Sequence, residues 1–328
     1  MLFPCCPGVF RWVRAGCVSR SRRPILSRGV GRTDRTPVLG GRPRRRWLPA
    51  LRGDRPVSSL AIARNDLRET RQSKILWLLG ATIMLGFGAL TYAAGEFLSS
   101  GFDLYLDVLT GVFVLLAPLI GVAVGYKAVI AERESGTIAL LMSLPHSRVE
   151  LVVGKLLGRF VVAGALLGFA LVGSGVVSLA VYPTFDFSGF VGFSLLVLFY
   201  TFTFVALATG FSMALSSSRR VIGAAFGAYV LLIMLWNQVV DVLVLILFRF
   251  RPSGLADPPL WAESAKFCTP LTSFTYLLDT TLGVGPGATG LDIGSQWFAS
   301  NWLALLVLSA WIVCPPALGY LSFRSTEF

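Results

Sequence analysis

The segment from Leu119 to Lys155 reads LIGVAVGYKAVIAERESGTIALLMSLPHSRVELVVGK and decides the fold. It begins and ends in apolar sequence, while its centre carries Glu132, Arg133 and Glu134. Because an apolar stretch of about 20 residues crosses a bilayer, we interpret the charged centre as a loop between two membrane spans. A membrane protein with few charges has no need to gather them in one loop unless they act outside the bilayer. This loop is therefore the first candidate for a functional site.

The composition of the chain indicates a polytopic membrane protein. Of its 328 residues, 55% are hydrophobic and 14% are charged, whereas about a quarter of the residues of a soluble domain are charged. The mean hydropathy is +0.72. A net charge of +12 would suggest a nucleic-acid partner, but residues 1–55 hold fourteen Arg, two Asp and no Lys, which is the whole excess. We therefore expect no nucleic-acid partner for the rest of the chain.

Residues 1–55 are rich in Arg, Pro and Gly and show no helical or alternating period, so we expect a disordered extension. Three interpretations stay open. The segment is an organellar transit peptide, an arm that binds nucleic acid or anionic lipid, or sequence upstream of the true start, with Val57 as alternative initiator. The cysteines of the remaining chain, Cys268 and Cys314, form no metal-ligand spacing, so no metal site is predicted.

Six stretches are long and apolar enough to span a membrane. We predict an all-α polytopic fold with six transmembrane helices, in a transmembrane domain over residues 75–328. The predicted spans are residues 75–95, 108–129, 156–182, 189–213, 221–248 and 302–322. Residues 249–301 form a long external loop that needs structure of its own. Its apolar middle, residues 270–278, is too short to span and predicts a re-entrant or surface-lying helix.

Basic side chains lie near the span ends on one side of the predicted membrane. They occur between Lys127 and Arg159 and again at Arg219, Arg220 and Arg324. The loops on the other side are mainly acidic. We expect a multi-pass protein of the plasma membrane, and in such proteins the cytoplasmic loops carry an excess of Lys and Arg. Both termini should be cytoplasmic.

Residues 56–74, before the first span, have the pattern of an amphipathic helix. Leu60, Ala63 and Leu67 recur at helical spacing against three arginines. Such a helix lies in the membrane interface, and we expect it to enter the first span as an elbow. The alternative is an ordinary basic flank.

The charged loop between the second and third spans predicts short helices of its own. Thr137–Leu144 is an apolar run of one to two turns that Pro145 stops. It is too short to cross a bilayer and has to bury its apolar face in another protein surface or in lipid headgroups. Residues 147–150 match a capping box, so the third helix should begin by about Arg148. From there, a basic stripe that includes Lys155 indicates either a docking surface or positive-inside anchoring.

Residues 132–155 resemble the cytoplasmic loop of ABC-2-type ABC transporter permeases. The similarity is greatest to the branch that contains the permease of the nitrous-oxide reductase maturation transporter. It rests on an acidic pair before Gly-Thr, then Pro-x-x-Arg, then Gly-Lys at the opening of the third span. A weaker match is residues 269–274, Thr-Pro-Leu-Thr-Ser-Phe, with Thr269 where Asn is usual. The resemblance covers about residues 58–328, and residues 1–55 have no counterpart.

The resemblance implies a coupling loop that docks in a cleft of a separate ATPase subunit. It implies a complex with two ATPase copies and a second permease copy, as homodimer or heterodimer, within membrane lipid, and it favours export. ATP and Mg²⁺ would sit on the ATPase, so no cofactor is expected on this chain. The carboxylates would meet basic groups of the partner. The residues assigned to coupling are Glu132, Arg133, Glu134, Gly136, Thr137, Ile138, Leu141, Leu144, Pro145, Arg148, Glu150 and Lys155.

The sequence does not favour an enzyme. Gly154-Lys155 is followed by Leu156, so the Gly-x4-Gly-Lys-Ser/Thr phosphate loop is missing from the sequence. The single histidine, His146, is interpreted as a turn residue. The alternatives to a permease subunit are an ion-coupled carrier and an accessory membrane scaffold.

Two further features lie within the predicted spans. Asn237, Gln238 and Asp241 form a possible intramembrane polar site, since polar groups are costly there and often functional. They indicate a substrate path or subunit interface, or else Asp241 already lies in water at the outer interface. Three Gly-x3-Gly pairs, beginning at Gly121, Gly164 and Gly223, predict close helix packing.

Overall fold

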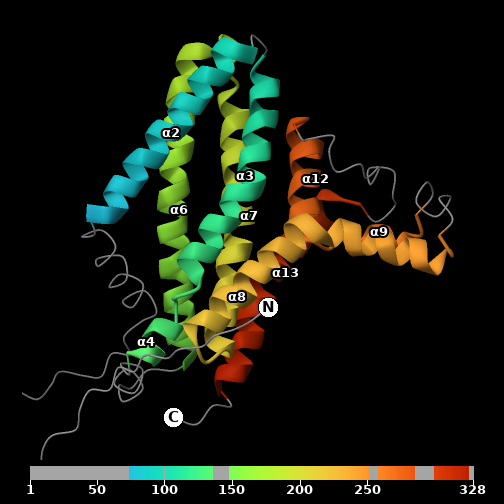
Figure 1. Ribbon diagram of the computed structural model, residues 1–328. Coiled ribbons are helices and arrows are strands. Elements are labelled where there is room, and N and C mark those ends of the chain that lie inside the picture. The colour runs from blue at the N-terminus through green and yellow to red at the C-terminus, as the bar shows by residue number, and fades with distance from the viewer. Residues whose placement is uncertain (1–73, 99–100, 136–147, 251–257, 285–298, 325–328) are drawn as a thin grey trace, which may run out of the picture. The chain divides into compact units, whose positions relative to one another are not determined.

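The computed structural model describes residues 74–98, 101–135, 148–250, 258–284 and 299–324, and every regular element in these ranges is helical (Figure 1). The Arg-rich extension and residues 56–73 of the predicted elbow helix lie outside them. An all-α polytopic fold is confirmed for the part of the chain that the structure describes.

Six helical stretches are long and apolar enough to cross a membrane, as predicted. The helices that form them are α2 (Lys74–Leu98), α3 (Phe102–Gly125), α6 (Arg148–Val181), α7 (Phe187–Ala214), the fifth span and α13 (Asn301–Arg324). The fifth span consists of α8 (Ser218–Val230), a π-helical turn (Leu231–Leu235) and α9 (Trp236–Leu247). The second span begins six residues earlier than predicted, because Phe102 and Tyr105 are buried against the bundle.

Helix α7 is the centre of the bundle. It packs along α3 and α13 and also contacts α6, α8 and α12, while α2 packs mainly along α6. In the most apolar part of α7, 56% of the residues are buried, against 17% in the fifth span. Side chains of α7 therefore contact other helices on several sides, whereas most side chains of the fifth span are not covered by the described residues.

Glycines allow close approach at several helix crossings, of which two bear on the site. A Cβ at Gly121 would lie 2.8 Å from the Thr201 carbonyl oxygen of α7, and one at Gly210 would lie 2.5 Å from the Pro315 carbonyl oxygen of α13. The Gly-x3-Gly pair in α3 thus packs closely, as predicted. The pair in α8 does not, because a Cβ at Gly223 or Gly227 would meet open space within the described residues.

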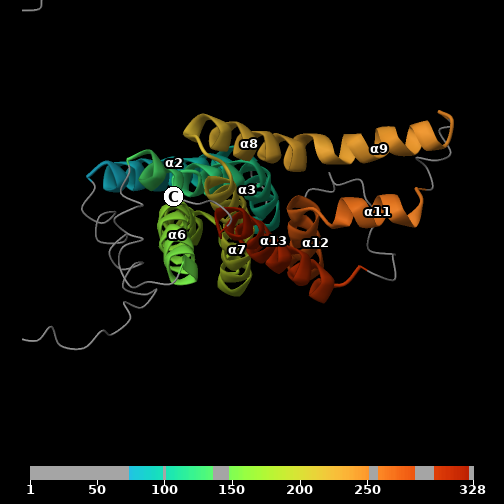
Figure 2. The same ribbon diagram turned by 90° about the horizontal axis from the view of Figure 1, so that it is seen from below.

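The fifth span changes direction where its helix changes type. A π turn interrupts the regular pattern of backbone hydrogen bonds, and Figure 1 shows α8 rising obliquely beside the bundle before α9 runs away from it. Helix α11 (Leu260–Phe267) lies beside α9 (Figure 2). We call α9 and α11 together the arm. The sequence did not predict this bend, because no Pro or Gly stands at residues 231–235.

Helix α12 (Pro270–Leu282) occupies the apolar middle of the predicted external loop. It packs against α7 and α13, and its Phe274 ring stacks on Tyr200 of α7 with centroids 4.3 Å apart. Both rings are fully buried. A helix is confirmed here, but it is built into the bundle rather than lying on its surface.

Candidate functional site

The charged loop enters the described structure as helix α4 (Ile130–Glu134), beside the end of α7 and the start of α6 and α8. The first N–H groups of a helix lack partners inside it. Here the backbone N–H groups of Val129 and Ile130 both donate to the buried Ser212 hydroxyl of α7, at 3.0 Å each. This double hydrogen bond fixes the start of α4 on α7.

Glu132 joins α4 to α6. Its carboxylate forms an ion pair with the ammonium of Lys155, whose side chain is only 5% exposed, while that of Glu132 is 24% exposed. An ammonium buried to this extent requires a charged or hydrogen-bonding partner. The pair therefore holds the beginning of α6 against α4.

Glu134 joins α4 to the fifth span. Its carboxylate accepts two hydrogen bonds from Ser218, one from the backbone N–H at 2.8 Å and one from the hydroxyl at 2.7 Å. Ser218 is the first residue of α8, and the N-cap side chain, Ser217, makes no capping hydrogen bond. A carboxylate at a helix N-terminus accepts hydrogen bonds from unpaired N–H groups and interacts favourably with the positive end of the helix dipole. Glu134 therefore caps α8 from another segment of the chain.

Arg133 completes the arrangement, because its Nη1 donates to the backbone carbonyl of Leu215 at 3.3 Å. Three consecutive residues of α4 thus contact three places: α6, the turn after α7, and the start of α8. We call this set of contacts the α4 junction. It consists of Glu132, Arg133, Glu134, Lys155, Ser212, Leu215 and Ser218. A displacement of α4 would be passed directly to the ends of three spans.

The structure places some of the predicted coupling residues and leaves others undescribed. Glu132, Arg133, Glu134 and Lys155 come together in the α4 junction, and α6 begins at Arg148 as predicted, with Glu150 in its first turn. The remaining ones, Gly136, Thr137, Ile138, Leu141, Leu144 and Pro145, lie outside the described residues.

The structure bears on two interpretations of the charges. Lys155 is buried, so it does not contribute to an exposed basic stripe on α6. The carboxylates of Glu132 and Glu134 already bind partners within the chain, and their contact with basic groups of another protein stays a prediction.

Ser212, Leu215 and Ser218 are site residues that the sequence did not reveal. Ser212 is one of several hydroxyl side chains in an apolar span, and Leu215 takes part only through its carbonyl, so neither carries a signal in the sequence. Ser218 could have been found, since Ser216-Ser217-Ser218 before Arg219 is typical of a helix start.

The predicted intramembrane polar site does not come together as one group. Asp241 forms an ion pair with Lys266 of α11, and the Trp236 indole N–H donates to the Ala265 carbonyl oxygen at 2.9 Å. Asn237 is half-buried and Gln238 is exposed. Asp241 therefore belongs to the contacts that hold the arm together.

The second motif that resembled the permeases is a helix cap. The Thr269 hydroxyl accepts from the Thr272 backbone N–H at 3.3 Å, and Pro270 follows as the first residue of α12. Thr and Asn both serve as N-caps, so Thr269 keeps the role that the more usual Asn would have.

Six membrane-capable helices, with polar contacts concentrated where a charged loop meets three of them, define a multi-pass membrane protein. The profile of the ABC-2 family transporter protein matches residues 60–328. The chain belongs to this family and is a permease subunit of an ABC transporter.

Two relatives are similar to the chain, and each is described as a "Probable ABC transporter permease protein NosY". The one from Pseudomonas aeruginosa is 30% identical over 195 residues, which covers 54% of this chain and 67% of the relative. The one from Stutzerimonas stutzeri is 27% identical over 283 residues, which covers 80% of this chain and 96% of the relative. Permeases of this family associate with an ABC ATPase subunit.

Proposed function

We propose that the chain is the membrane subunit of an exporter of the plasma membrane, driven by ATP hydrolysis on a separate ATPase subunit. The complex would hold two ATPase copies and a second permease copy. The observation that carries the proposal is the α4 junction, because it connects the charged loop to the ends of the third, fourth and fifth spans. Export is supported by the resemblance to other permeases of this type.

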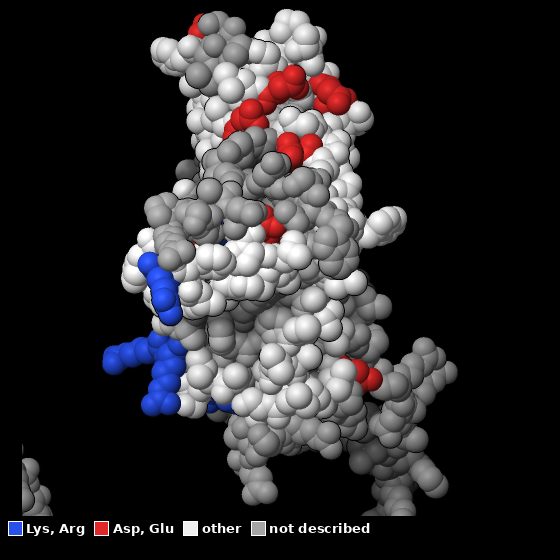
Figure 3. Space-filling model, turned by 90° about the vertical axis from the view of Figure 1, so that its right-hand side faces the viewer, with Lys and Arg blue, Asp and Glu red and all other residues white. Residues whose placement is uncertain are grey.

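The distribution of charge supports a cytoplasmic position for the α4 junction. Lys127, Arg219 and Arg220 lie near it, whereas the α2–α3 and α6–α7 turns carry Asp or Glu and no described Lys or Arg. Those two turns lie together, because Phe102 packs on Tyr182 and Phe185. Figure 3 shows most of the acidic side chains of one face toward its upper end and the basic ones lower down. By the positive-inside rule, both termini are cytoplasmic.

The contacts of the α4 junction suggest how movement of the ATPase reaches the membrane spans. When the ATPase closes on nucleotide, it displaces residues 136–147 of the predicted coupling segment, and α4 moves with them. The Glu132–Lys155 ion pair carries this motion to α6, and the Glu134–Ser218 hydrogen bonds carry it to α8. ATP and Mg²⁺ are bound by the partner. This chain contributes the coupling segment, the α4 junction and the transmembrane helices.

The proposal is tested in a purified complex with the ATPase by substituting Glu134→Lys or Gly136→Pro. Glu134→Lys places a cation at the positive end of the α8 dipole, and Gly136→Pro alters the loop. Both should leave membrane insertion intact and abolish stimulation of ATP hydrolysis by the permease.

Glu96→Lys is the matched control, because Glu96 is exposed at the far end of α2. It should leave stimulation unchanged. Full stimulation by the Glu134→Lys complex would contradict the proposal.

A further inference from the structure

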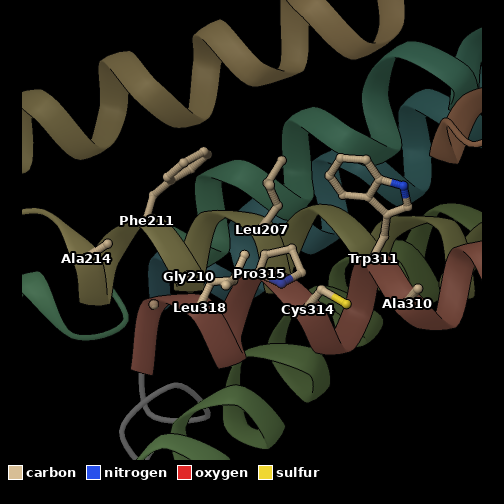
Figure 4. A pocket seen from close by; sticks show the side chains of 10 residues that line it. Leu207, Gly210, Phe211, Ala214, Ala310, Trp311, Cys314, Pro315 and Leu318 are labelled. Carbon is tan, nitrogen blue, oxygen red and sulfur yellow. The ribbon is translucent and has the colours of Figure 1, made fainter. Parts of the chain in front are cut away.

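Helices α7 and α13 bound an apolar cavity of about 480 Å³. Figure 4 shows Leu207 and Phe211 of α7 and Trp311 of α13 pointing to the same side of the helix pair, above Cys314 and Pro315. Natural ligand sites have volumes of about 300–1,000 Å³. The cavity is therefore large enough to hold a ligand.

A second cavity, of about 340 Å³, continues the first. Both are lined by Leu207, Phe211 and Trp311, and the second extends to Leu232 and Trp236 at the π turn. We call the two cavities together the groove. One of its walls is thus the part of the fifth span where the helix is irregular, and the opposite wall is the α7–α13 pair.

The walls of the groove offer few hydrogen-bonding groups. The Trp311 indole N–H already donates to the Cys268 carbonyl oxygen, and that of Trp236 donates to the Ala265 carbonyl oxygen, both at 2.9 Å. The Thr269 hydroxyl is used within the α12 cap. The described residues that line the two cavities include no Asp, Glu, Lys or Arg. A sugar, a peptide or an ion would lose its hydrogen bonds to water here without gaining others.

The floor of the groove is preformed. At the crossing of α7 and α13, the backbones touch at Gly210 and Gly319, where an added Cβ would meet backbone atoms of the other helix. These helices also make the most extensive contact in the described bundle. The groove therefore exists before any ligand arrives, so binding requires little ordering of its side chains or backbone.

The groove is built only from membrane-spanning helices and from the α11–α12 junction packed among them. The medium around the spans is lipid hydrocarbon. An aliphatic chain has the apolar surface that the walls match, and it needs no hydrogen bond. It is also present at high concentration at the open side of the groove.

We propose that the groove binds a hydrocarbon chain of a membrane lipid. The chain lies between α7–α13 on one side and the π turn of the fifth span on the other, with its end beside Cys314. This site goes beyond the proposed ATPase coupling and does not depend on it.

The test uses the full chain in phosphatidylcholine vesicles that contain a phosphatidylethanolamine with a photoreactive diazirine at the end of one acyl chain. No ATP or partner is added, so failure of the coupling proposal does not affect the result. After illumination, mass spectrometry should find the lipid attached to residues 310–319 more strongly than to exposed residues of α2. Equal labelling of all lipid-facing helices would overturn the proposal.

A matched pair of variants on α13 locates the lipid. Ala310→Trp places an indole ring in the larger cavity and should reduce labelling of the groove about tenfold, which corresponds to about 1.4 kcal/mol of binding free energy. Ala317→Trp, exposed on the same helix and outside the lining of both cavities, should leave labelling unchanged. If Ala310→Trp does not fold, Ala214→Trp fills the same cavity from the end of α7.

A second copy of the chain is the competing occupant. It would bring Cys314 near a Cys314 of the other copy or near another groove residue. Oxidation of the protein in vesicles, with Cys5, Cys6 and Cys17 replaced by Ser, should give no dimer linked through Cys314. Formation of that disulfide, or labelling unaffected by Ala310→Trp, would show that the groove is not a lipid site.

Discussion

Two lysine–carboxylate ion pairs stand in the described part of the chain, and they differ in their surroundings. Lys155 pairs with Glu132 at the α4 junction, and Lys266 pairs with Asp241 in the arm. The lysine side chains are similarly buried, at 5% and 9% exposed, but Glu132 is 24% exposed and Asp241 is 41% exposed. The first pair is the more enclosed.

The neighbours of the two pairs explain the difference. At the α4 junction, Arg133 and Glu134 bind the turn after α7 and the start of α8 beside the ion pair. In the arm, the ion pair and the Trp236 hydrogen bond join only α9 to α11. The same kind of ion pair thus belongs to contacts that join several spans in one region, and to contacts that join the fifth span to the following helix in the other. Sequence alone does not separate these roles.

The largest expected effect is that of Lys155→Met. It removes the Lys155 ammonium from its ion pair with the partly buried Glu132 carboxylate, and we expect a loss of about 3 kcal/mol of unfolding free energy, at the lower end for buried pairs. Lys266→Met should cost about 1 kcal/mol, because Asp241 can be solvated. Unfolding in mild detergent, followed by tryptophan fluorescence, measures both.

The double variant Glu132→Gln/Lys155→Met is the control for the first substitution. It removes both charges and should recover most of the lost stability. An equal cost for the two single variants would remove the distinction between the junction and the arm.

Glycine substitutions extend the comparison to the helices themselves. Gly125→Ala places a Cβ 2.7 Å from the Val205 carbonyl oxygen in the bundle, and overpacking of this kind costs about 1–3 kcal/mol. Gly227→Ala in α8 meets open space and should be neutral or stabilising by up to about 1 kcal/mol. Thermal unfolding measures both variants, and a lower midpoint for Gly227→Ala would show that α8 is packed more closely than described.

The smallest effect is expected at the far end of the bundle, where Asp186 caps α7 through Ser188 and Gly189. The hydrogen bond from the Ser188 hydroxyl, with those from the two backbone N–H groups, lowers the pKa of Asp186 below its ordinary 3.8. Because the pKa of Asp186 is lower in the folded protein than in the unfolded chain, the charged carboxylate stabilises the fold. This stabilisation is fully present above the pKa of the unfolded chain and is lost as the pH falls through the pKa of the folded protein.

Asp186→Asn keeps the cap but removes the titration. Its unfolding midpoint should therefore change less than that of the unaltered chain as the pH is lowered below about 4. Identical pH dependence of the two proteins would contradict a charged cap at this position.

The sequence predicted the spans well because apolar length decides them. The start of α6 at Arg148 followed from local capping signals. The bend after Val230 was missed because it arises where α9 leaves the bundle to pair with α11, through Asp241 and Lys266, which stand 25 positions apart. Local patterns do not record such contacts.

The candidate site was predicted in part. The rarity of charges in this chain singles out Glu132, Glu134 and Lys155, but it does not reveal their partners within the chain. The sequence left Glu134 beside Arg133, whereas the structure pairs it with Ser218, 84 positions later. The apolar groove had no signal either, since Leu, Phe and Trp in a span are typical of any lipid-facing or buried position.

The central claim is that Glu134 transmits movement of the loop to α8 through Ser218, and a double-mutant cycle tests it most directly. Stimulation of ATP hydrolysis is measured for complexes with Glu134→Ala, Ser218→Ala and both. Each single variant should lose stimulation, Glu134→Ala by about fivefold or more, and the double variant should be no worse than Glu134→Ala alone. Full stimulation with Glu134→Ala, or losses that multiply in the double variant, would contradict this route.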